Sequence, residues 1–497
     1  MSQKIQKIVY SLMTVYVLYC IALLYWTIIY SGSGDGDTLE HVHSSWMVYH
    51  GKIPYKDFFQ HHNPLMWYLA APFVGMFEYT LRAVDAANAL TATATALAML
   101  YMYRMHKDFL TNEIGGLIAA AFFALPQESL YNKDFKPDNF MTSALVIGIY
   151  YFLCYVKEKK LSKLVISFLA LFAAFMFTQK AALIILGIGC IGLYLLEQKQ
   201  LKITDCLYAA ILPVAIYLTF LAFLYSEGVL QLYFKANFEL NSHIPDVFYT
   251  RRFISPCWEM IYPLILAFYS LLFCSYKENI YVKIISAIFV IEYVIRMYYF
   301  TPFIYYFAFL HAMASIMAGI GAMDIIRRHS YLVWCFVAYF LICGGIYFNT
   351  YRYRITIGDS FKYGASGLVL EKTTPCDYVL NGYRIGYNLF NKDVDFIWNL
   401  KGQIDVIAAT IGIRPLSDLE SLVRKYKPKI IYGGNYYDTY REYRGDIGKY
   451  PIHWISRHLL NEMYEPLYRD NLYILKPEFQ KHNCQYNPRT KTYEYRD

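Results

Sequence analysis

The sequence is short of charged residues. Only 17% of its 497 residues are Asp, Glu, Lys or Arg, and 57% are hydrophobic, whereas an average soluble domain has about 25% charged and about 45–50% apolar residues. Both departures exclude an ordinary soluble protein. They indicate a chain that runs largely through a membrane, and its 19% aromatic content suits rings placed at membrane interfaces.

Motifs of several soluble functional classes are also missing. No Cys-x-x-Cys or Cys/His ligand spacing occurs, so no structural zinc site is indicated. The polar tail has glycines but no Gly-x-Gly-x-x-Gly, which argues against a nucleotide site. Much of the net charge of +8 lies in short loops between apolar runs, where it sets membrane orientation rather than binding nucleic acid.

Most of the ten cysteines lie inside apolar runs, where they are most simply small buried hydrophobes. Cys376 and Cys484 lie in the polar C-terminal part. They could pair if that part is extracytoplasmic, although nothing in their spacing demands it.

Apolar runs long enough to approach a membrane span, which takes about 20 residues, recur along the first two thirds of the chain. About eleven helices are expected, at Ile8–Tyr30, Ala83–Met105, Asn112–Leu125, Asn139–Val156, Leu164–Thr178, Ala181–Leu196, Ile203–Leu224, Pro256–Cys274, Ile280–Tyr299, Pro302–Met323 and Tyr331–Phe348. The first run is too long for a signal-peptide core.

Every second connection is short and basic, as the positive-inside rule requires of cytoplasmic loops. If the stretch 164–196 formed one helix, every later basic loop would lie on the outer side, so two helices fit better. The expected protein is therefore a multi-pass protein of the plasma (inner) membrane with a cytoplasmic N-terminus. Its transmembrane domain covers residues 1–348, with outer segments 31–82, 126–138 and 225–253, and an extracytoplasmic domain covers residues 349–497.

The tail alternates between strand and helix patterns. Strands are expected at 377–381, 429–434 and 471–475, and a helix at 417–426 with Ser417 as its N-cap. This alternation predicts a small α/β domain.

Acidic and histidine side chains are concentrated in the first outer segment: Asp35, Asp37, Glu40, His41, His43, His61 and His62. A carboxylate just outside a helix end, in a Gly-rich turn, can act as a general base at the membrane surface. The alternative is that these acids are merely solvated. Residues 65–76 have the pattern of an interfacial helix rather than a span.

In the same segment Asp37 is followed by Pro54-Tyr55-Lys56-Asp57-Phe58-Phe59 and His62-Asn63-Pro64-Leu65, and Lys136-Pro137-Asp138 and Thr178-Gln179-Lys180 come later in the chain. With these motifs the segment resembles the first external loop of the GT-C superfamily of membrane glycosyltransferases. It is nearest to bacterial relatives of protein O-mannosyltransferases and lipid A aminoarabinose transferases. These short motifs indicate the family and leave the sugar and the acceptor open.

The resemblance implies an inverting transfer from a polyprenyl-phosphate sugar to a lipid, glycan or protein acceptor. It places the catalytic base on Asp37, with Asp35 as the alternative. In the family's loop two acids are adjacent; here Thr38 follows Asp37, and the next acid is Glu40. Transfer of a whole glycan to Asn is not expected, because the oligosaccharyltransferase Trp-Trp-Asp-Tyr-Gly motif is missing.

The leaving phosphate needs cations or hydrogen-bond donors. Candidates for donor or substrate binding are Lys133, Lys136, Asp138, Lys180, Arg296, His61 and His62. Lys180 at a helix end could instead extend its amine to the headgroups, and Arg296 could pair with Glu292 four residues earlier. His311 is expected to be a packed, hydrogen-bonded residue.

No cofactor is expected, and no metal site is assigned, although the loop acids and histidines leave a divalent cation open. The rival functions are a secondary transporter or a polysaccharide-export component. Transporters commonly have repeated halves and broken helices, and the sequence has neither feature. The large outer segments also favour chemistry over transport.

Cysteine-accessibility labelling tests the predicted topology. Single cysteines placed at positions 37 and 132, and in the tail beyond residue 350, should react with an impermeant reagent from the outer side. A cysteine at position 158 should react only after the membrane is opened. A tail that reacts only from the cytoplasm would contradict an odd number of spans.

Overall fold

The computed structural model describes residues 2–31, 36–124, 134–247, 260–275, 278–298, 304–362, 365–380, 388–397, 407–415, 418–432, 455–468, 472–487 and 492–495. The chain forms two compact units. One comprises residues 1–31, 88–222 and 250–356, and the other comprises residues 32–87, 223–249 and 357–497. The sequence-based division at residue 348 differs from this, because two of the three outer segments belong to the same unit as the tail.

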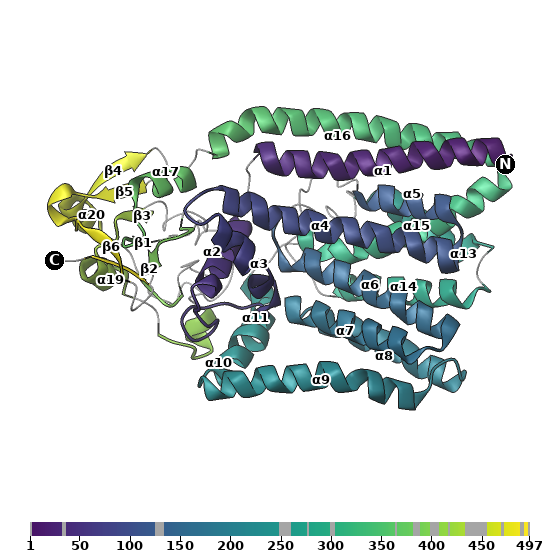
Figure 1. The fold of residues 1–497 in the computed structure, drawn as a ribbon, viewed down its shortest axis with the longest axis horizontal. Helices are drawn as coiled ribbons and strands as arrows, with labels where there is room; N and C mark the ends of the chain where they lie inside the picture. Colours follow the sequence, from purple (N-terminus) through teal and green to yellow (C-terminus); the bar gives the residue numbers. More distant parts are fainter. Residues whose placement is uncertain are drawn as a thin grey trace. The chain divides into compact units, whose positions relative to one another are not determined.

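The first unit is helical (Figure 1). Its main helices are α1 (Gln3–Ser31), α4 (Arg82–Met105, which begins in the other unit), α5 (Glu113–Ala124), α6 (Pro137–Glu158), α7 (Leu161–Phe177), α8 (Ala181–Glu197), α9 (Ile203–Ser226), α13 (Ile261–Phe273), α14 (Ile280–Tyr298), α15 (Ala308–Arg328) and α16 (Val333–Lys362). Short turns η1 (His106–Leu110), η4 (Ile304–Phe307) and η5 (Ser330–Leu332) adjoin them.

Each of the eleven predicted apolar runs corresponds to one of these helices. Six described helices are long and apolar enough to cross a membrane by length and composition alone, at Gln3–Tyr30, Arg82–Leu110, Pro137–Glu158, Ile203–Ser226, Ala308–Arg328 and Ser330–Asn349. The protein is thus a multi-pass membrane protein, while the total of eleven spans stays a prediction. The stretch 164–196 forms two helices, α7 and α8, as predicted.

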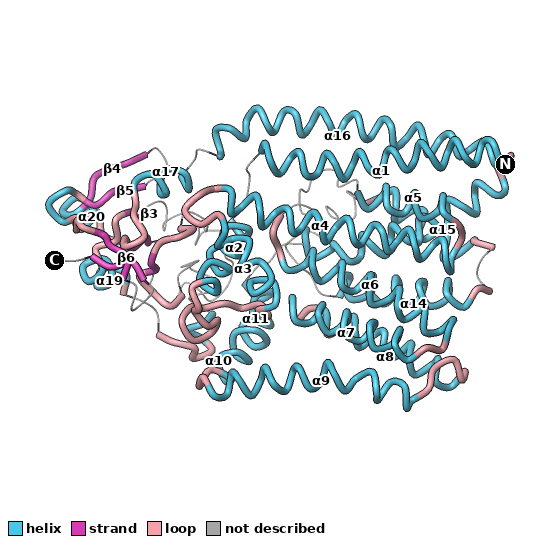
Figure 2. Tube along the Cα trace, in the orientation of Figure 1, coloured by secondary structure: helices cyan, strands magenta, loops and turns pink. Residues whose placement is uncertain are grey.

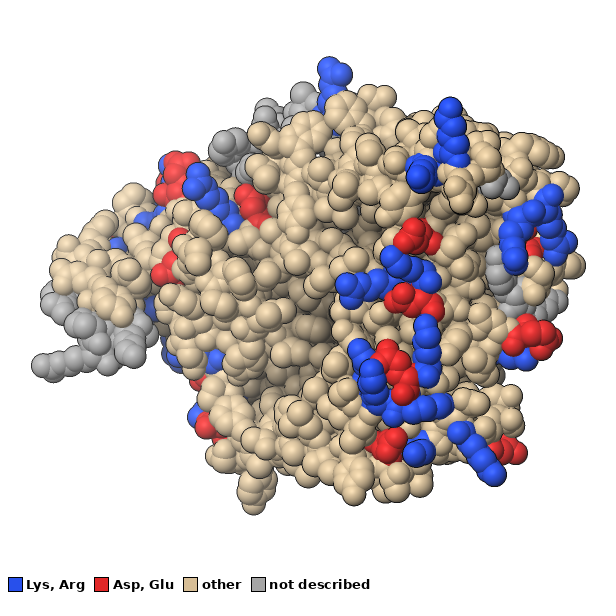
Figure 3. Space-filling model, turned by 45° about the vertical axis from the view of Figure 1, so that its right-hand side comes forward, with Lys and Arg blue, Asp and Glu red and all other residues tan. Residues whose placement is uncertain are grey.

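The basic connections of this unit meet one another. In the α6–α7 connection, Lys159 Nζ donates to the backbone oxygen of Gln200 in the α8–α9 connection. Asn279, before α14, donates to the carbonyl of Phe109 in η1, and Arg328 at the end of α15 donates to the carbonyl of Phe273 at the end of α13. The loops that carry the Lys and Arg residues therefore lie at one end of the helices, as alternating spans require. Figure 3 shows Lys and Arg side chains interspersed with Asp and Glu in a band right of the centre of the view, with smaller charged groups elsewhere on this face.

Helices α1 and α16 lie side by side (Figure 1). Tyr16 packs on Phe340 with ring centroids 5.4 Å apart, and Leu23 packs against Tyr347. The core of the unit is built on α15, whose residues 308–324 are all buried.

The second unit contains helices α2 (Gly36–Tyr49), α3 (Leu65–Met76), α10 (Leu230–Phe234), α11 (Leu240–Val247), α17 (Ala365–Lys372), α19 (Leu419–Tyr426) and α20 (Arg457–Met463), with turns η3 (Lys235–Glu239) and η8 (Pro477–Phe479). Helix α3 has the predicted bounds. The segment around Asp37 was predicted to be a turn, and this was wrong, because Asp37 lies in the first turn of α2.

The strands described in the structure all come from the tail (Figure 2). Strands β1 (Tyr378–Leu380), β2 (Lys392–Asp393), β3 (Ile430–Tyr432), β4 (Tyr464–Tyr468) and β5 (Leu472–Leu475) form a sheet of order β2-β1-β3-β5-β4. The first three pair in parallel, whereas β5 is antiparallel to β3 and β4. Val379, Ile430 and Leu472 share one core cluster, so the three predicted strands are confirmed.

The N-cap of α19 differs from the prediction. The Asp418 side chain, not Ser417, accepts the hydrogen bond from the Ser421 backbone N–H. Ser417 lies outside the described residues. Both residue types suit an N-cap, so sequence preference alone could not separate them.

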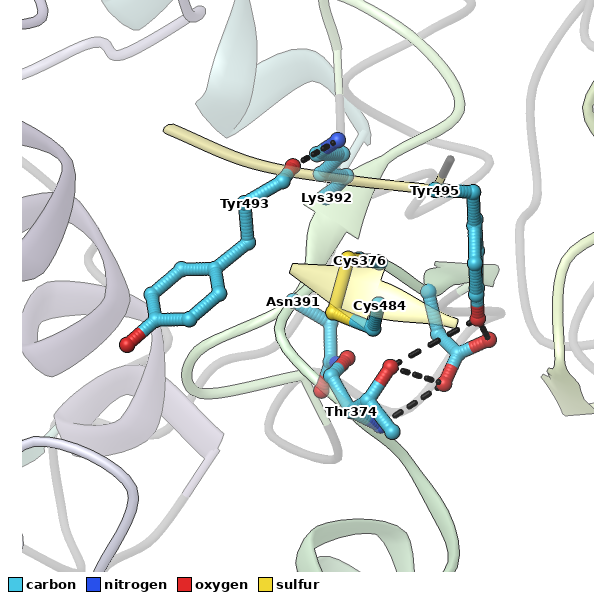
Figure 4. The surroundings of a disulfide bond; sticks show 8 residues. Thr374, Cys376, Asn391, Lys392, Cys484, Tyr493 and Tyr495 are labelled. Atoms are coloured by element: carbon cyan, nitrogen blue, oxygen red, sulfur yellow. Dashed lines mark hydrogen bonds between the residues drawn. A yellow bond between two sulfur atoms is a disulfide. The ribbon is translucent and has the colours of Figure 1, made fainter. Parts of the chain in front are cut away.

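A disulfide joins Cys376, just before β1, to Cys484 in the hairpin of β6 (Cys484–Asn487) and β7 (Thr492–Tyr495) (Figure 4). Beside it the Tyr495 hydroxyl donates to Asp377, whose other carboxylate oxygen accepts from the Thr374 N–H at 2.7 Å. The hairpin is thereby fastened to the start of the sheet.

Counting thiols tests the disulfide. Denatured full-length protein treated with a maleimide–polyethylene glycol reagent should gain two more adducts after reduction than before it, because Cys376 and Cys484 become free. The double variant Cys376→Ser/Cys484→Ser should show no such difference. Equal adduct numbers before and after reduction of the unaltered protein would contradict the pairing.

Candidate functional site

Helix α2 positions the acids of the first outer segment. Asp37 lies in its first turn and is partly exposed, while Glu40 and His41 are buried. Residues three and four apart share one face of a helix, so Asp37 lies on the same side as Glu40 and His41. A carboxylate in the first turn of a helix interacts favourably with the helix dipole. Asp35 lies outside the described residues.

The Glu40 carboxylate serves the fold of this segment. It accepts a hydrogen bond at 3.2 Å from the side-chain amide of Gln60, which also donates to Ser44 Oγ at 2.7 Å. Both contacts join α2 to the chain that follows it, and Glu40 is almost fully buried. Of the two described acids near the start of α2, Asp37 is therefore the accessible one.

Three histidines lie together, His41 within α2 and His61 and His62 in the chain after it. The rings of His61 and His62 are 4.3 Å apart, and the ring of His41 is 5.5 Å from that of His62. Trp67 Nε1 donates to His41 Nδ1 at 3.2 Å, so that nitrogen carries no proton. The predicted substrate-binding pair His61 and His62 is thus placed beside His41 of α2.

The main chain around these histidines is held from several sides. Tyr55 Oη donates to the His62 carbonyl at 2.5 Å, and Asn241 in α11 donates to the His61 carbonyl at 2.7 Å. Tyr233 Oη in α10 donates to Asn63 at 2.9 Å. Helices α10 and α11, which lie within the predicted outer loop 225–253, therefore hold the first outer segment in place.

A second polar cluster lies within the helical unit. Lys180 Nζ donates to both carboxylate oxygens of Asp138, at 3.1 and 3.4 Å, and lies 3.2 Å from the centroid of the Tyr306 ring. Asp138 is buried and Lys180 is nearly so, with 2% and 17% of their side chains exposed. Sequence analysis selected Asp138 and Lys180 separately, and the structure brings them together.

This contact also brings two helix N-termini together. Lys136 is the N-cap residue of α6 and Lys180 that of α8. Proline at the first position of α6 has no N–H to leave unpaired and suits a helix start, and it keeps Lys136 extended. Helix N-termini carry partial positive charge and free N–H groups, which suit anions. The two termini form a corner at which two lysines, Lys136 and Lys180, outnumber one carboxylate, Asp138.

Arg296 differs from these lysines. Its Nε donates to Glu292 Oε1 at 2.6 Å, and both side chains are buried in α14. The structural ion pair considered from the sequence is therefore present, and a role for Arg296 in phosphate binding stays a prediction. Lys133, the remaining candidate, lies outside the described residues. His311 is buried in α15 with its ring 5.5 Å from that of Phe123.

Sequence reasoning missed the partner of His43. In α2 this fully buried side chain contacts Asp393 of β2 through Nε2 at 2.8 Å and the Leu389 carbonyl through Nδ1 at 3.0 Å. Burial by itself lowers the pKa of His43, but Asp393 and the Leu389 carbonyl outweigh it, so the pKa is raised. No local pattern could reveal a pair 350 residues apart.

A cavity of about 470 Å³ opens beside this contact. Its walls come from the end of α2, the chain after it, and the sheet and hairpin of the tail, and include the side chains of Trp46, Phe58, Tyr79, Tyr378, Tyr426 and Tyr493. These aromatic residues are scattered over the sequence, so only folding collects them.

Among the described residues, no group of three or more His, Cys, Asp or Glu side chains is arranged to bind a metal ion. The histidines next to α2 lie close to one another, but their rings face each other and Trp67. Metal independence stays a prediction.

Solved structures resemble this fold. ArnT from Cupriavidus metallidurans bound to undecaprenyl phosphate matches with a TM-score of 0.60 at 12% identity, covering 93% of this chain and 97% of that chain. The apo oligosaccharyltransferase of Archaeoglobus fulgidus matches with a TM-score of 0.51 at 13% identity, covering 85% and 69%. A family model described as dolichyl-phosphate-mannose-protein mannosyltransferase matches residues 61–225. No curated protein matches by sequence.

Thermal unfolding in detergent tests the structural role of Arg296. Arg296→Ala should destabilise the protein by about 3–5 kcal/mol, because it leaves the Glu292 carboxylate buried without its partner. The double variant Glu292→Gln/Arg296→Gln removes both charges and should recover much of the loss.

Lys283→Ala is the matched control. Lys283 pairs with Glu278 at the surface, where such pairs contribute about 0–1 kcal/mol. An Arg296→Ala protein that unfolds at the same temperature as this control would contradict the structural assignment.

Proposed function

We propose that this chain, which has the fold of the GT-C membrane glycosyltransferases, transfers a sugar from a polyprenyl-phosphate donor to an acceptor at the outer face of the membrane, with inversion at the sugar. The observation that carries the proposal is the contact between Lys180 and Asp138, which joins two lysine-capped helix N-termini. Such a corner suits a phosphate group.

The donor phosphate would lie at this corner. Lys136 and Lys180 supply positive charge, and the N-terminal ends of the α6 and α8 dipoles add to it. Asp138 positions Lys180 by two hydrogen bonds, and the Tyr306 ring lies against the same amine. Charge that develops on the leaving phosphate would be stabilised by groups already in place. A resemblance to ArnT bound to undecaprenyl phosphate supports this kind of donor.

Asp37 would act as the general base. Its carboxylate is partly exposed at the start of α2, six residues after α1 ends at Ser31. The acceptor hydroxyl gives its proton to Asp37 while its oxygen attacks the anomeric carbon. The bond between that carbon and the phosphate oxygen breaks on the opposite side, and polyprenyl phosphate leaves with the electron pair. One base suffices, because no covalent intermediate forms.

Two observations support an orientation with the basic loops in the cytoplasm and the tail outside. The basic connections of the helical unit lie at one end of the helices, where the positive-inside rule places the cytoplasm. The tail contains the Cys376–Cys484 disulfide, and such bonds persist mainly outside the cytoplasm. In this arrangement the acids of α2 and the tail face the outer side.

Replacing the base tests the mechanism. Asp37→Asn preserves the size of the side chain but cannot accept the proton, and general-base catalysis contributes about 10²–10⁴-fold. Release of sugar from a radiolabelled polyprenyl-phosphate sugar, measured in membranes that carry the protein, should fall at least about 100-fold, while donor binding persists. Asp35→Asn should cost clearly less.

Glu239→Gln is the control, since it removes an exposed acid in η3 of the same unit. If Asp35→Asn lost turnover and Asp37→Asn kept it, the base would be Asp35, two residues before the assigned position. Normal turnover in both variants would contradict the outer-loop base and favour a transporter.

A further inference from the structure

The cavity at the far end of α2 has the chemistry of a carbohydrate site. Four tyrosines line it, Tyr79, Tyr378, Tyr426 and Tyr493, and each is only partly buried. A tyrosine offers a flat apolar face and a polar tip. A sugar ring offers the matching surfaces, with C–H groups on its faces and hydroxyls on its edge. We infer that this cavity is a saccharide subsite that binds an acceptor glycan.

The charges that line the cavity nearly balance. Asp57, Asp393 and Asp395 face Lys52 and Lys392, so the lining has three acidic and two basic side chains besides His50. A polyanion such as a phosphorylated glycan or a nucleic acid needs a clear excess of positive charge. The lining therefore favours a neutral saccharide, whose hydroxyls can both donate to carboxylates and accept from amines.

Several lining groups are already held in place. Asp393 receives hydrogen bonds from His43 at 2.8 Å and from Asn388 at 2.6 Å, one on each carboxylate oxygen. Each oxygen has a second lone pair that can accept from a ligand. The Tyr378 and Tyr426 rings lie 4.9 Å apart. A site whose groups are fixed in advance loses less entropy when a ligand binds.

The hairpin contributes the opposite wall. Lys392 Nζ donates to the Tyr493 carbonyl at 2.8 Å, and the disulfide holds β6, the partner strand of β7, close to Pro375 (Figure 4). Pro375 also lines the cavity. The position of Tyr493 in the wall therefore depends on the Cys376–Cys484 bond.

The distance along α2 between the cavity and Asp37 sets the length of the ligand. Trp46 follows Asp37 by nine residues on the same helix, which is about 14 Å at about 1.5 Å per residue. That distance exceeds one sugar ring. An acceptor that reaches from the cavity to Asp37 has several sugar rings, so the inference rests on the proposed function and narrows its acceptor from lipid, glycan or protein to a glycan.

The test measures binding without any donor. Full-length protein in detergent is applied to an array of immobilised neutral oligosaccharides of two to six hexoses, beside an array of Ser- and Thr-containing peptides. Binding to oligosaccharides is expected. Tyr378→Ala and Tyr426→Ala should each weaken it about two- to tenfold, the range of an aromatic contact, whereas Tyr378→Phe should retain most of it.

Tyr473→Ala is the matched control, because Tyr473 lies in β5 of the same sheet and does not line the cavity. Asp37→Asn should bind oligosaccharides but transfer little sugar. An unaltered protein that binds oligosaccharides but transfers no sugar would sink the proposed function and not the subsite. Binding to peptides that is lost in Tyr378→Ala would overturn the saccharide assignment. So would the lack of binding to either array, or equal binding by Tyr426→Ala and Tyr473→Ala.

Discussion

The contact between His43 and Asp393 is the interaction on which the second unit depends. It joins α2, which carries the candidate base, to β2 of the tail sheet, across a sequence separation of 350 residues. Both side chains are buried or nearly so, so losing one partner would leave the other uncompensated, at a typical cost of about 3–5 kcal/mol. Asn388 and the Leu389 carbonyl complete the cluster and tie it to the chain before β2.

The same contact makes the unit sensitive to pH in one direction. Because the pKa of His43 is raised by folding, the folded state binds the imidazolium proton more tightly than the unfolded chain does. Its contribution to stability is complete below the unfolded pKa of about 6.5 and is lost as the pH rises through the folded pKa. A fall in pH would therefore strengthen the connection between α2 and the sheet.

Much of the helical unit could be predicted from the sequence, because a bilayer imposes a length and a composition on every helix that crosses it. The runs 164–178 and 181–196 were separated by loop charge alone, and α7 and α8 match them. Helix α2 was not predicted, because its composition does not mark it as the bilayer marks the spanning helices. Its residues 38 to 46 are nearly all buried although many are polar, so no apolar stripe marks it as a helix.

Some residues of the candidate site could likewise be predicted from the sequence, whereas some of its contacts could not. Lys136, Asp138 and Lys180 lie beside helix starts that short motifs mark, and the sequence could select them. That Lys180 would contact Asp138 depends on packing between helices. The pair of Arg296 with Glu292 lies within α14, and the sequence already offered it as one of two alternatives. The Cys376–Cys484 pair was left open because two cysteines in a polar tail can equally remain thiols.

The cavity has a consequence for the order in which the protein folds. Its walls are Trp46 and Phe58 on one side and Tyr378 to Tyr493 on the other, and the apolar runs between residues 83 and 348 separate them in the sequence. During synthesis the aromatic side chains of the first wall are made long before those of the second wall. They remain without these contacts until the intervening helices have entered the bilayer. Contacts of such high sequence separation form slowly. We therefore expect α2 and the segment after it to be the part of this protein that folding factors outside the membrane protect longest.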